Sequence, residues 1–320
     1  MKNFKKLAIA MLLLPSAYPI AAEANCGAEF CSLNTDWDIQ GVANKPGVRL
    51  DLRAEYINPD QLRHGSSKTK PAGEVDEHDE LRTINRNYLA TLEWNINPTW
   101  GVTFKLPLID RAHKHLDNED DGFGGVEQTL EKWDFSGIGD IQAIARYRFY
   151  VDQKQNAGLR FGLQIPTGSI NKKNSEGEVA ERTLQPSSGS VDSVLGAYYN
   201  HQVGQLSWFA QGAWQQSVHQ RKNFKPGRKL SADVGVSYSA TPDFSLLLQL
   251  NAQHKSRDSG INAEPADSGG HSLSVSPGIS YRVTGNTRIY GFVQKPLVQY
   301  VNGTQLTPDW SAALGINTTF

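Results

Sequence analysis

The sequence has little cysteine and no long apolar segment beyond its first two dozen residues. Its 320 residues include only two Cys and two Met. Two cysteines are too few for the disulfide framework that stabilises small secreted domains. The one sustained apolar run ends before residue 23, and a helix that crosses a bilayer needs about 20 apolar residues. A polytopic helical membrane protein is therefore excluded.

An excess of charge of one sign is also absent. The chain has 32 basic and 33 acidic residues, a formal net charge of −1. A protein that binds nucleic acid carries a basic excess to offset the phosphates, so no nucleic-acid partner is expected. Aromatic residues make up 9% of the chain, which argues against disorder. The mean hydropathy of −0.47 resembles that of a soluble protein, and the length suits two ordinary domains or one large β-barrel.

The first 24 residues have the pattern of a signal peptide. Three lysines lie within the first six residues, an apolar stretch follows over residues 7–14, and Ala22-Glu23-Ala24 offers the small-x-small motif of a cleavage site. This order of basic, apolar and small residues is typical of secretory signals. We expect cleavage after this motif and export of the remaining chain.

Export to an oxidising compartment changes the role expected of the two cysteines. Cys26 and Cys31 are separated by four residues, and in an oxidising compartment such a pair closes a small disulfide loop. A redox or copper-handling role is the alternative, but the Cys-x-x-Cys spacing and a nearby His or Met are missing. We expect residues 25–46 to form a short periplasmic lead with a structural disulfide.

Apolar and polar residues alternate along most of the exported chain. In the ninth segment below, Leu246, Leu248 and Leu250 alternate with Gln249 and Asn251. Period-2 alternation of this kind predicts strands with one apolar face. Twelve segments qualify: 47–57, 84–96, 99–109, 137–151, 157–166, 190–202, 206–219, 228–239, 244–254, 271–283, 287–298 and 307–320.

The connections between these segments separate a soluble sandwich from a membrane barrel. Links from even to odd segments have at most five residues, whereas those from odd to even segments have eight or more: 58–83, 110–136, 167–189, 220–227, 255–270 and 299–306. Outer-membrane barrels have short periplasmic turns and long extracellular loops. We therefore predict an all-β fold, a single transmembrane antiparallel barrel of twelve strands over residues 47–320.

Aromatic residues cluster near the short links, where an interfacial girdle belongs. They are Trp94, Trp100, Tyr147, Phe149, Trp208, Tyr238, Phe244, Tyr281 and Tyr290. The last alternating segment ends on Phe320, which resembles the recognition signal of barrel assembly. The expected location is the outer membrane, and the expected partners are its lipid and lipopolysaccharide and, through the last strand, the barrel-assembly machinery.

The polar register of a barrel strand points into the lumen. The candidate lumen-lining residues are Arg49, Asp51, Arg53, Glu55, Glu93, Lys105, Arg146, Arg148, Arg160, Asp192, Asp233 and Arg282. Charges at this depth need water or ion pairing. One hypothesis is a narrow pore for a small solute, with Arg49, Arg53, Arg146 and Arg148 as a positive strip. The alternative is a structural or adhesion-type barrel with a closed, salt-bridged lumen.

Two predicted outer loops are rich in acidic residues. Residues 74–80 read EVDEHDE, and residues 113–121 read HKHLDNEDD. Oxygen ligands can hold Ca²⁺ or Mg²⁺, and His113 and His115 can join a transition-metal site. Solvated acidic loops are the commoner explanation, and the spacing matches no calcium loop. The sequence therefore assigns no metal site and no cofactor.

Enzyme motifs are weak. Gly137-Ile-Gly139-Asp140 is half of a dinucleotide-binding fingerprint, but it opens a strand instead of a helix. No Gly-x-Ser-x-Gly, His-Glu-x-x-His or phosphate-binding Gly-Lys-Ser/Thr motif occurs. No catalytic residue is assigned, and the protein is not expected to be an enzyme.

Three short motifs resemble one outer-membrane family. They are Gly137-Ile-Gly139-Asp140 followed by Arg146-Tyr147-Arg148, then Ile165-Pro166-Thr167-Gly168, then Pro186-Ser187-Ser188-Gly189-Ser190-Val191-Asp192. Over residues 80–320 the chain resembles the transporter-like family labelled putative MetA-pathway of phenol degradation, although Ser187 stands where a Gly is expected. The resemblance implies a channel-like barrel that passes a small solute, with an aromatic or other hydrophobic compound suggested by the family label.

Overall fold

The computed structural model describes residue 33 and residues 46–74, 78–219 and 222–320. The predicted signal peptide of residues 1–24 and both cysteines lie outside the described residues. Within the described ranges the regular structure is entirely strand. No helix among these residues has the length and apolar character to cross a membrane.

The described residues form fourteen strands in one sheet. In chain order they are β1 (Gly47–His64), β2 (Ser67–Lys68), β3 (His78–Asn95), β4 (Trp100–Asp120), β5 (Val126–Ile138), β6 (Ile141–Val151), β7 (Gln155–Ile165), β8 (Val191–Val203), β9 (Leu206–His219), β10 (Lys229–Ser239), β11 (Phe244–Lys255), β12 (Gly270–Arg282), β13 (Thr287–Val301) and β14 (Thr304–Thr319).

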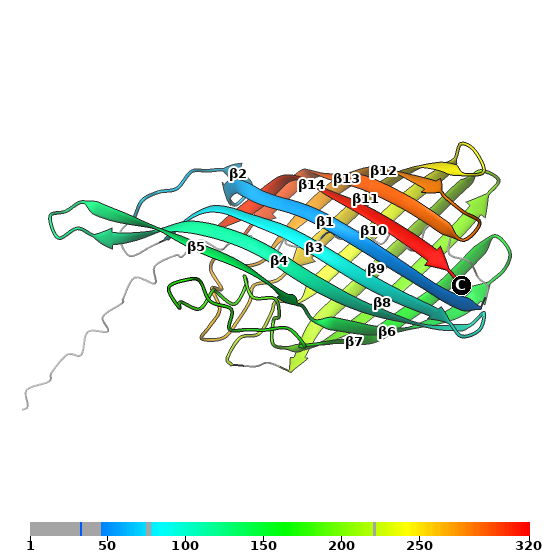
Figure 1. Ribbon diagram of the computed structural model, residues 1–320, viewed down its shortest axis with the longest axis horizontal. Coiled ribbons are helices and arrows are strands. Elements are labelled where there is room, and N and C mark those ends of the chain that lie inside the picture. The colour runs from blue at the N-terminus through cyan, green and yellow to red at the C-terminus, as the bar shows by residue number, and fades with distance from the viewer. Residues whose placement is uncertain (1–32, 34–45, 75–77, 220–221) are drawn as a thin grey trace, which may run out of the picture.

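The sheet closes into a barrel because β14 pairs with β1 (Figure 1). The strand β2 only extends a hairpin with β1, and β5 and β6 pair with successive parts of β4. The described barrel therefore has twelve strand positions, all antiparallel, as the alternation predicts. Closure removes free sheet edges, which a lipid environment requires.

The predicted strand over 137–151 is correct in its upper bound and wrong in its lower bound. Its described equivalent is longer and interrupted, since β5 begins at Val126 and a break at Gly139 and Asp140 separates it from β6. At the break the Gly139 amide donates to the Pro107 carbonyl at 2.8 Å. A Cβ at Gly139 would lie 2.9 Å from Pro107 Cγ, so the chain passes β4 closely here.

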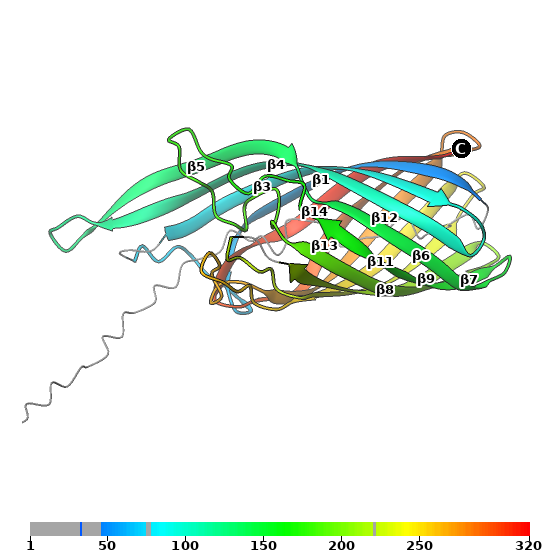
Figure 2. The ribbon, with the colours of Figure 1, turned by 90° about the horizontal axis from the view of Figure 1, so that it is seen from below.

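The strands β3, β4 and β5 extend beyond the rest of the barrel at the end opposite the C-terminus (Figures 1 and 2). Residues 110–136 and 299–306 were expected to be long loops. They are mostly paired strand instead, closed by turns at residues 121–125 and 302–303. Alternation cannot detect such an extension, because past the membrane neither face has to be apolar.

The outer face of the barrel is apolar over one band. On β11 the exposed fractions of Leu246, Leu248 and Leu250 are 48%, 46% and 40%, whereas Gln249 is 1% exposed on the inner face. On β3 and β4 this apolar band ends at an outward ion pair in which Arg86 Nη1 lies 2.9 Å from Asp110 Oδ1. Residues of β3 before Arg86 and of β4 after Asp110 therefore lie outside the membrane.

Six of the nine predicted girdle aromatics are exposed at the short-turn rim: Trp94, Trp100, Phe149, Trp208, Tyr238 and Tyr281. Tyr290 corrects the prediction, because it is 7% exposed and faces the lumen. Its hydroxyl donates to Asp51, with oxygen–oxygen distances of 3.0 and 2.9 Å. Gly315, its partner on β14, leaves room for the ring. A buried tyrosine hydroxyl needs such a hydrogen-bond partner. Proximity to a short turn therefore does not decide whether an aromatic side chain faces the lipid or the lumen.

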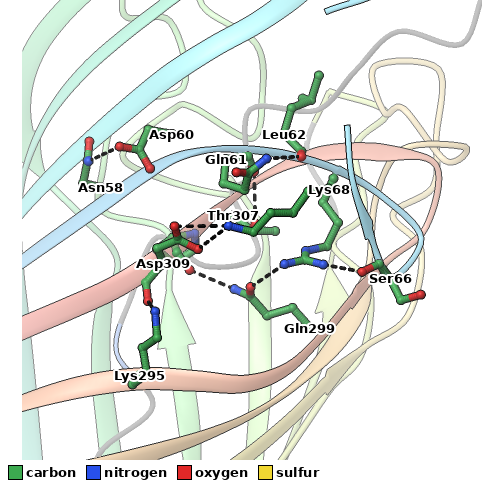
Figure 3. Close-up of polar contacts among 12 residues, drawn as sticks. Asn58, Asp60, Gln61, Leu62, Ser66, Lys68, Lys295, Gln299, Thr307 and Asp309 are labelled. Carbon is green, nitrogen blue, oxygen red and sulfur yellow. Dashed lines mark hydrogen bonds and ion pairs between the residues drawn. The ribbon is translucent and has the colours of Figure 1, made fainter. Parts of the chain in front are cut away.

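Polar contacts join β1, β13 and β14 at the outer end of the closing seam (Figure 3). The register between β1 and β14 shifts on both sides of Pro59, which has no amide hydrogen to donate. Beyond this irregularity Thr307 Oγ1 donates to the Gln61 carbonyl at 3.0 Å. Lys68 Nζ lies 3.2 Å from Asp309 Oδ1, and Gln299 Nε2 donates to the Pro308 carbonyl at 3.0 Å.

Candidate functional site

The barrel encloses a polar cavity of about 470 Å³. Its wall comes mainly from inward residues of β1, β3, β4 and β6 to β10. Among the lining side chains six are cationic and four are acidic: Arg53, Lys105, Arg111, Arg146, Arg160 and Lys229 against Glu55, Glu93, Asp140 and Asp233. The described lining thus has a formal excess of two positive charges and a size in the range of small-molecule sites.

Most cations of the predicted positive strip are engaged by acceptors. Arg49 Nη2 lies 2.8 Å from Glu93 Oε2, and Arg53 Nη2 lies 2.8 Å from Glu55 Oε1. Glu93 also has Arg146 Nη1 at 3.9 Å. Such buried pairs are stable only when additional hydrogen bonds satisfy them. The strip is therefore a mixed-charge network rather than a row of free cations.

Arg148 and Arg282, two of the predicted residues, are not part of the cavity lining. Arg148 is 2% exposed and donates to Asn95 Oδ1 at 2.8 Å and to the Pro98 carbonyl at 3.0 Å, beside a short turn. Arg282 lies at the end of β12, where its Nε is 4.0 Å from Asp243 Oδ1. These two arginines hold the short-turn rim.

The candidate aspartates accept hydrogen bonds from amide and hydroxyl side chains. Asp233 accepts hydrogen bonds from Gln211 at 2.8 Å and Asn251 at 2.7 Å. Asp192, which is 4% exposed and outside the cavity lining, accepts from Gln215 at 2.8 Å and from Ser190 at 2.8 Å. Asp51 accepts from Tyr290, as described above. The amide residues of the predicted lumen therefore act as partners for buried carboxylates.

A small apolar cluster lies on the inner side of β1, β11, β13 and β14, next to buried polar side chains such as Gln249, Asn251 and Ser276. The buried cluster is Leu33, Ile57, Leu247, Tyr290, Phe292 and Ala313. Leu33 is 8% exposed and also lines the polar cavity. It belongs to the predicted lead at 25–46, of which the structure describes residues 33 and 46, and it lies inside the barrel. The lumen therefore combines a small apolar cluster with a mainly polar wall.

The three motifs that carry the family resemblance meet at Asp140. Its carboxylate accepts hydrogen bonds from the Gly168 amide at 3.3 Å and from the Ser188 amide at 3.1 Å. Thr167 Oγ1 donates to the Gly139 carbonyl at 2.7 Å. These bonds fix both ends of the segment 166–190 against the break between β5 and β6. Pro186 and Ser188 then form part of the cavity wall.

Sequence reasoning missed Arg111, Lys229 and Asp140 as cavity residues. Arg111 lies just beyond a predicted strand, and Asp140 was considered only as part of short sequence motifs and not as a lumen residue. Arg111 donates to the Thr183 carbonyl at 3.1 Å, to the Leu184 carbonyl, and through Nε to Asn85 at 2.6 Å. Extending the alternation of residues 99–109 by one more pair would have placed Arg111 inward.

Comparison with known proteins identifies the family. A family model described as "Putative MetA-pathway of phenol degradation" matches residues 115–317, more than half of the chain. The chain belongs to this family. The matched region begins at His115 and therefore includes the Asp140 junction and all strands from β5 to β13. No curated protein sequence matches the chain.

The fold of this family member is shared by a solved outer-membrane channel. The crystal structure of the COG4313 outer membrane channel from Pseudomonas putida F1 is 13% identical, with a TM-score of 0.66 and coverage of 89% of this chain and 100% of that chain. The Ralstonia pickettii toluene transporter TbuX is 10% identical, with a TM-score of 0.44 and coverage of 86% and 90%. The chain is thus an outer-membrane β-barrel.

Proposed function

We propose that this protein is a passive outer-membrane channel for a small amphipathic solute, such as an aromatic compound with a hydroxyl or carboxylate group. The observation that supports it most is a polar cavity that lies next to an apolar cluster inside the barrel. The cluster offers Leu33, Phe292 and other apolar groups, and the polar cavity has a small cationic excess. A ring with one polar or anionic group matches this combination.

The family label supports the aromatic part of this proposal, since it refers to phenol degradation. The Pseudomonas putida protein of the same fold is described as a channel, and we propose a channel rather than an enzyme here as well. A cavity of about 470 Å³ holds one small molecule and not a wide column of water. Passage is therefore expected to be slow and selective by size.

We also propose that the predicted lead controls this passage. In this proposal residues 1–24 are removed on export, Cys26 and Cys31 form a disulfide, and residues 25–46 keep Leu33 in the lumen. Leu33 supports the idea because it contacts the apolar cluster and narrows the polar cavity at once. We further propose that the barrel-assembly machinery recognises the last strand, which ends at Phe320, and that lipopolysaccharide surrounds the outer end.

Solute flux into proteoliposomes tests the channel. Vesicles with the purified barrel should take up phenol-sized aromatic acids faster than empty vesicles, and larger sugars should be excluded. Planar bilayers should show small currents with a modest anion preference. An absence of both flux and current would contradict the channel and favour the closed structural barrel, for which the ion pairs of Glu55 and Glu93 are the supporting observation.

A further inference from the structure

A compact cluster of imidazole and carboxylate groups lies outside the membrane on the extension of β3 and β4. His78 and Glu80 come from β3, His115 comes from β4, and Glu181 comes from the segment 166–190. One potential ligand atom of each residue lies within 4.8 Å of those of the others. The cluster is separate from the lumen cavity, whose lining contains none of the four.

A β-bulge brings the two residues of β3 into this cluster. In the pairing of β3 with β4, Glu80 is opposite His115, and Arg82 is opposite Lys114, so one residue of β3 is extra. Further along β3, Ile84 and Arg86 face outward. Without the bulge, residues at even positions such as His78 and Glu80 would face outward too, because side chains alternate along a strand.

Glu80 is the member of the cluster whose buried carboxylate lacks hydrogen bonds within the described part of the chain. It is 1% exposed, and neither of its carboxylate oxygens accepts a hydrogen bond among the described residues. The closest basic atoms are His78 Nε2 at 3.5 Å and His113 Nε2 at 3.7 Å. A buried carboxylate without a hydrogen bond is strongly unfavourable. A bound cation would offset this desolvation penalty.

The other three members are suited to coordinate that cation. His78 Nε2 lies 3.3 Å from Glu181 Oε1. Tetrahedral zinc with bonds of about 2.0–2.1 Å places its ligand atoms about 3.3 Å apart, so this pair needs little movement. His115 offers an imidazole nitrogen as a further ligand, which first-row transition metal ions accept readily.

The surroundings orient His115 and attract positive charge. One ring nitrogen of His115 lies 3.2 Å from His113 Nε2, and the other lies 3.3 Å from Glu131 Oε2. Coordination through one nitrogen leaves the other contact to hold the ring, as carboxylates and imidazoles around metal sites commonly do. The carboxylates of Glu178 and Asp117 lie near that of Glu131, and three carboxylates so close together attract positive charge.

We propose that His78, Glu80, His115 and Glu181 bind one divalent first-row transition metal ion, with Zn²⁺ as the ion expected from two imidazoles and two carboxylates. Imidazole ligands favour such ions over Ca²⁺ and Mg²⁺, which prefer oxygen donors. Because Glu181 belongs to the segment 166–190 and the other ligands belong to strands, the metal joins this segment to the extension. The inference does not depend on the proposed transport function.

Zinc titration of the chelator-treated full-length barrel in detergent tests the site. Calorimetry should show one tight Zn²⁺ per chain that excess Ca²⁺ does not displace. The substitution Glu181→Gln should weaken this binding at least about 100-fold, more than is usual for loss of an outer contact. Trp133 gives a second readout, since its ring lies 4.8 Å from that of His115. Cu²⁺ should quench its fluorescence in wild type and not in Glu181→Gln.

A matched control comes from an outward-facing histidine pair on β11 and β12. His254 and His271 are cross-strand partners with ring centroids 6.5 Å apart. The double substitution of both by Ala should leave the tight site unchanged. Heat-modifiable migration on gels checks that each variant is a folded barrel. No tight Zn²⁺ in wild type, equal binding by Glu181→Gln, or full competition by Ca²⁺ would each overturn the proposal.

Discussion

Glu80 and Thr83 both face the interior of the extension, although Thr83 follows Glu80 by three residues along β3. Glu80 is opposite His115 and Thr83 is opposite His113, and both side chains are buried. Thr83 Oγ1 and His113 Nδ1 are 3.0 Å apart. A regular strand would put residues at such a spacing on opposite faces. The β-bulge around Leu81 shifts the alternation by one residue, so both side chains face the same side of β3.

Deletion of Leu81 should therefore abolish tight zinc binding and leave the barrel folded. Removal of the extra residue restores regular alternation and turns Glu80 and His78 outward. We expect a loss of Zn²⁺ affinity of at least about 100-fold by calorimetry. Deletion of Phe123, which is 97% exposed at the tip of the β4–β5 hairpin, is the matched control. Retained binding after the Leu81 deletion would show that the bulge does not create the site.

The substitution Arg146→Gln should shift the ion preference of the channel toward cations. Arg146 lines the cavity beside Glu93, which keeps Arg49 at 2.8 Å in the variant. The cationic excess of the lining falls by one charge, and the low-dielectric wall amplifies the effect. The reversal potential in a salt gradient measures the shift. Arg282→Gln at the rim serves as control, and equal reversal potentials for wild type and Arg146→Gln would exclude Arg146 from the pathway.

The substitution Leu33→Ala should increase passage through the lumen. Truncation removes apolar contacts with the cluster around Ile57 and Phe292, and a buried Leu→Ala change destabilises packing by about 2–5 kcal/mol. The single-channel conductance should rise. Leu52→Ala, a change of the same size at a residue 47% exposed on the lipid face, should leave the conductance unaltered. A lower or equal conductance in Leu33→Ala would rule out a constricting role.

The substitution Asp140→Asn should loosen the segment 166–190. The carboxylate accepts bonds from the Gly168 and Ser188 amides, and loss of such buried bonds costs about 1–3 kcal/mol. Cleavage near Lys172 and Lys173 by trypsin should become faster, by about 10-fold for 1.4 kcal/mol. Asp152→Asn makes the same change at a short turn, where Asp152 accepts from the Lys154 and Gln155 amides. Equal cleavage in both variants would contradict the anchoring role.

The sequence by itself determined the fold class and the side of most barrel residues. Alternation with period 2 is a local property, so Leu246 and Leu248 outward and Gln249 inward follow from their positions alone. The aromatic and turn patterns add the orientation of the two rims. Proximity to a short turn was a wrong guide at Tyr290, because the alternation along β13, its hydrogen-bonded hydroxyl and the space over Gly315 place the ring inside.

Only the tertiary structure decided which residues distant in sequence lie in contact. Beyond the membrane both strand faces meet polar surroundings, so periodicity gives no sign of the β4–β5 hairpin or of the bulge near Leu81. His115 and Glu181 are far apart along the chain and meet because the Asp140 junction folds the segment 166–190 back against the strands. Leu33 reaches the lumen from outside the barrel strands. Contacts of this kind depend on chain path and cross-strand register, which no local pattern encodes.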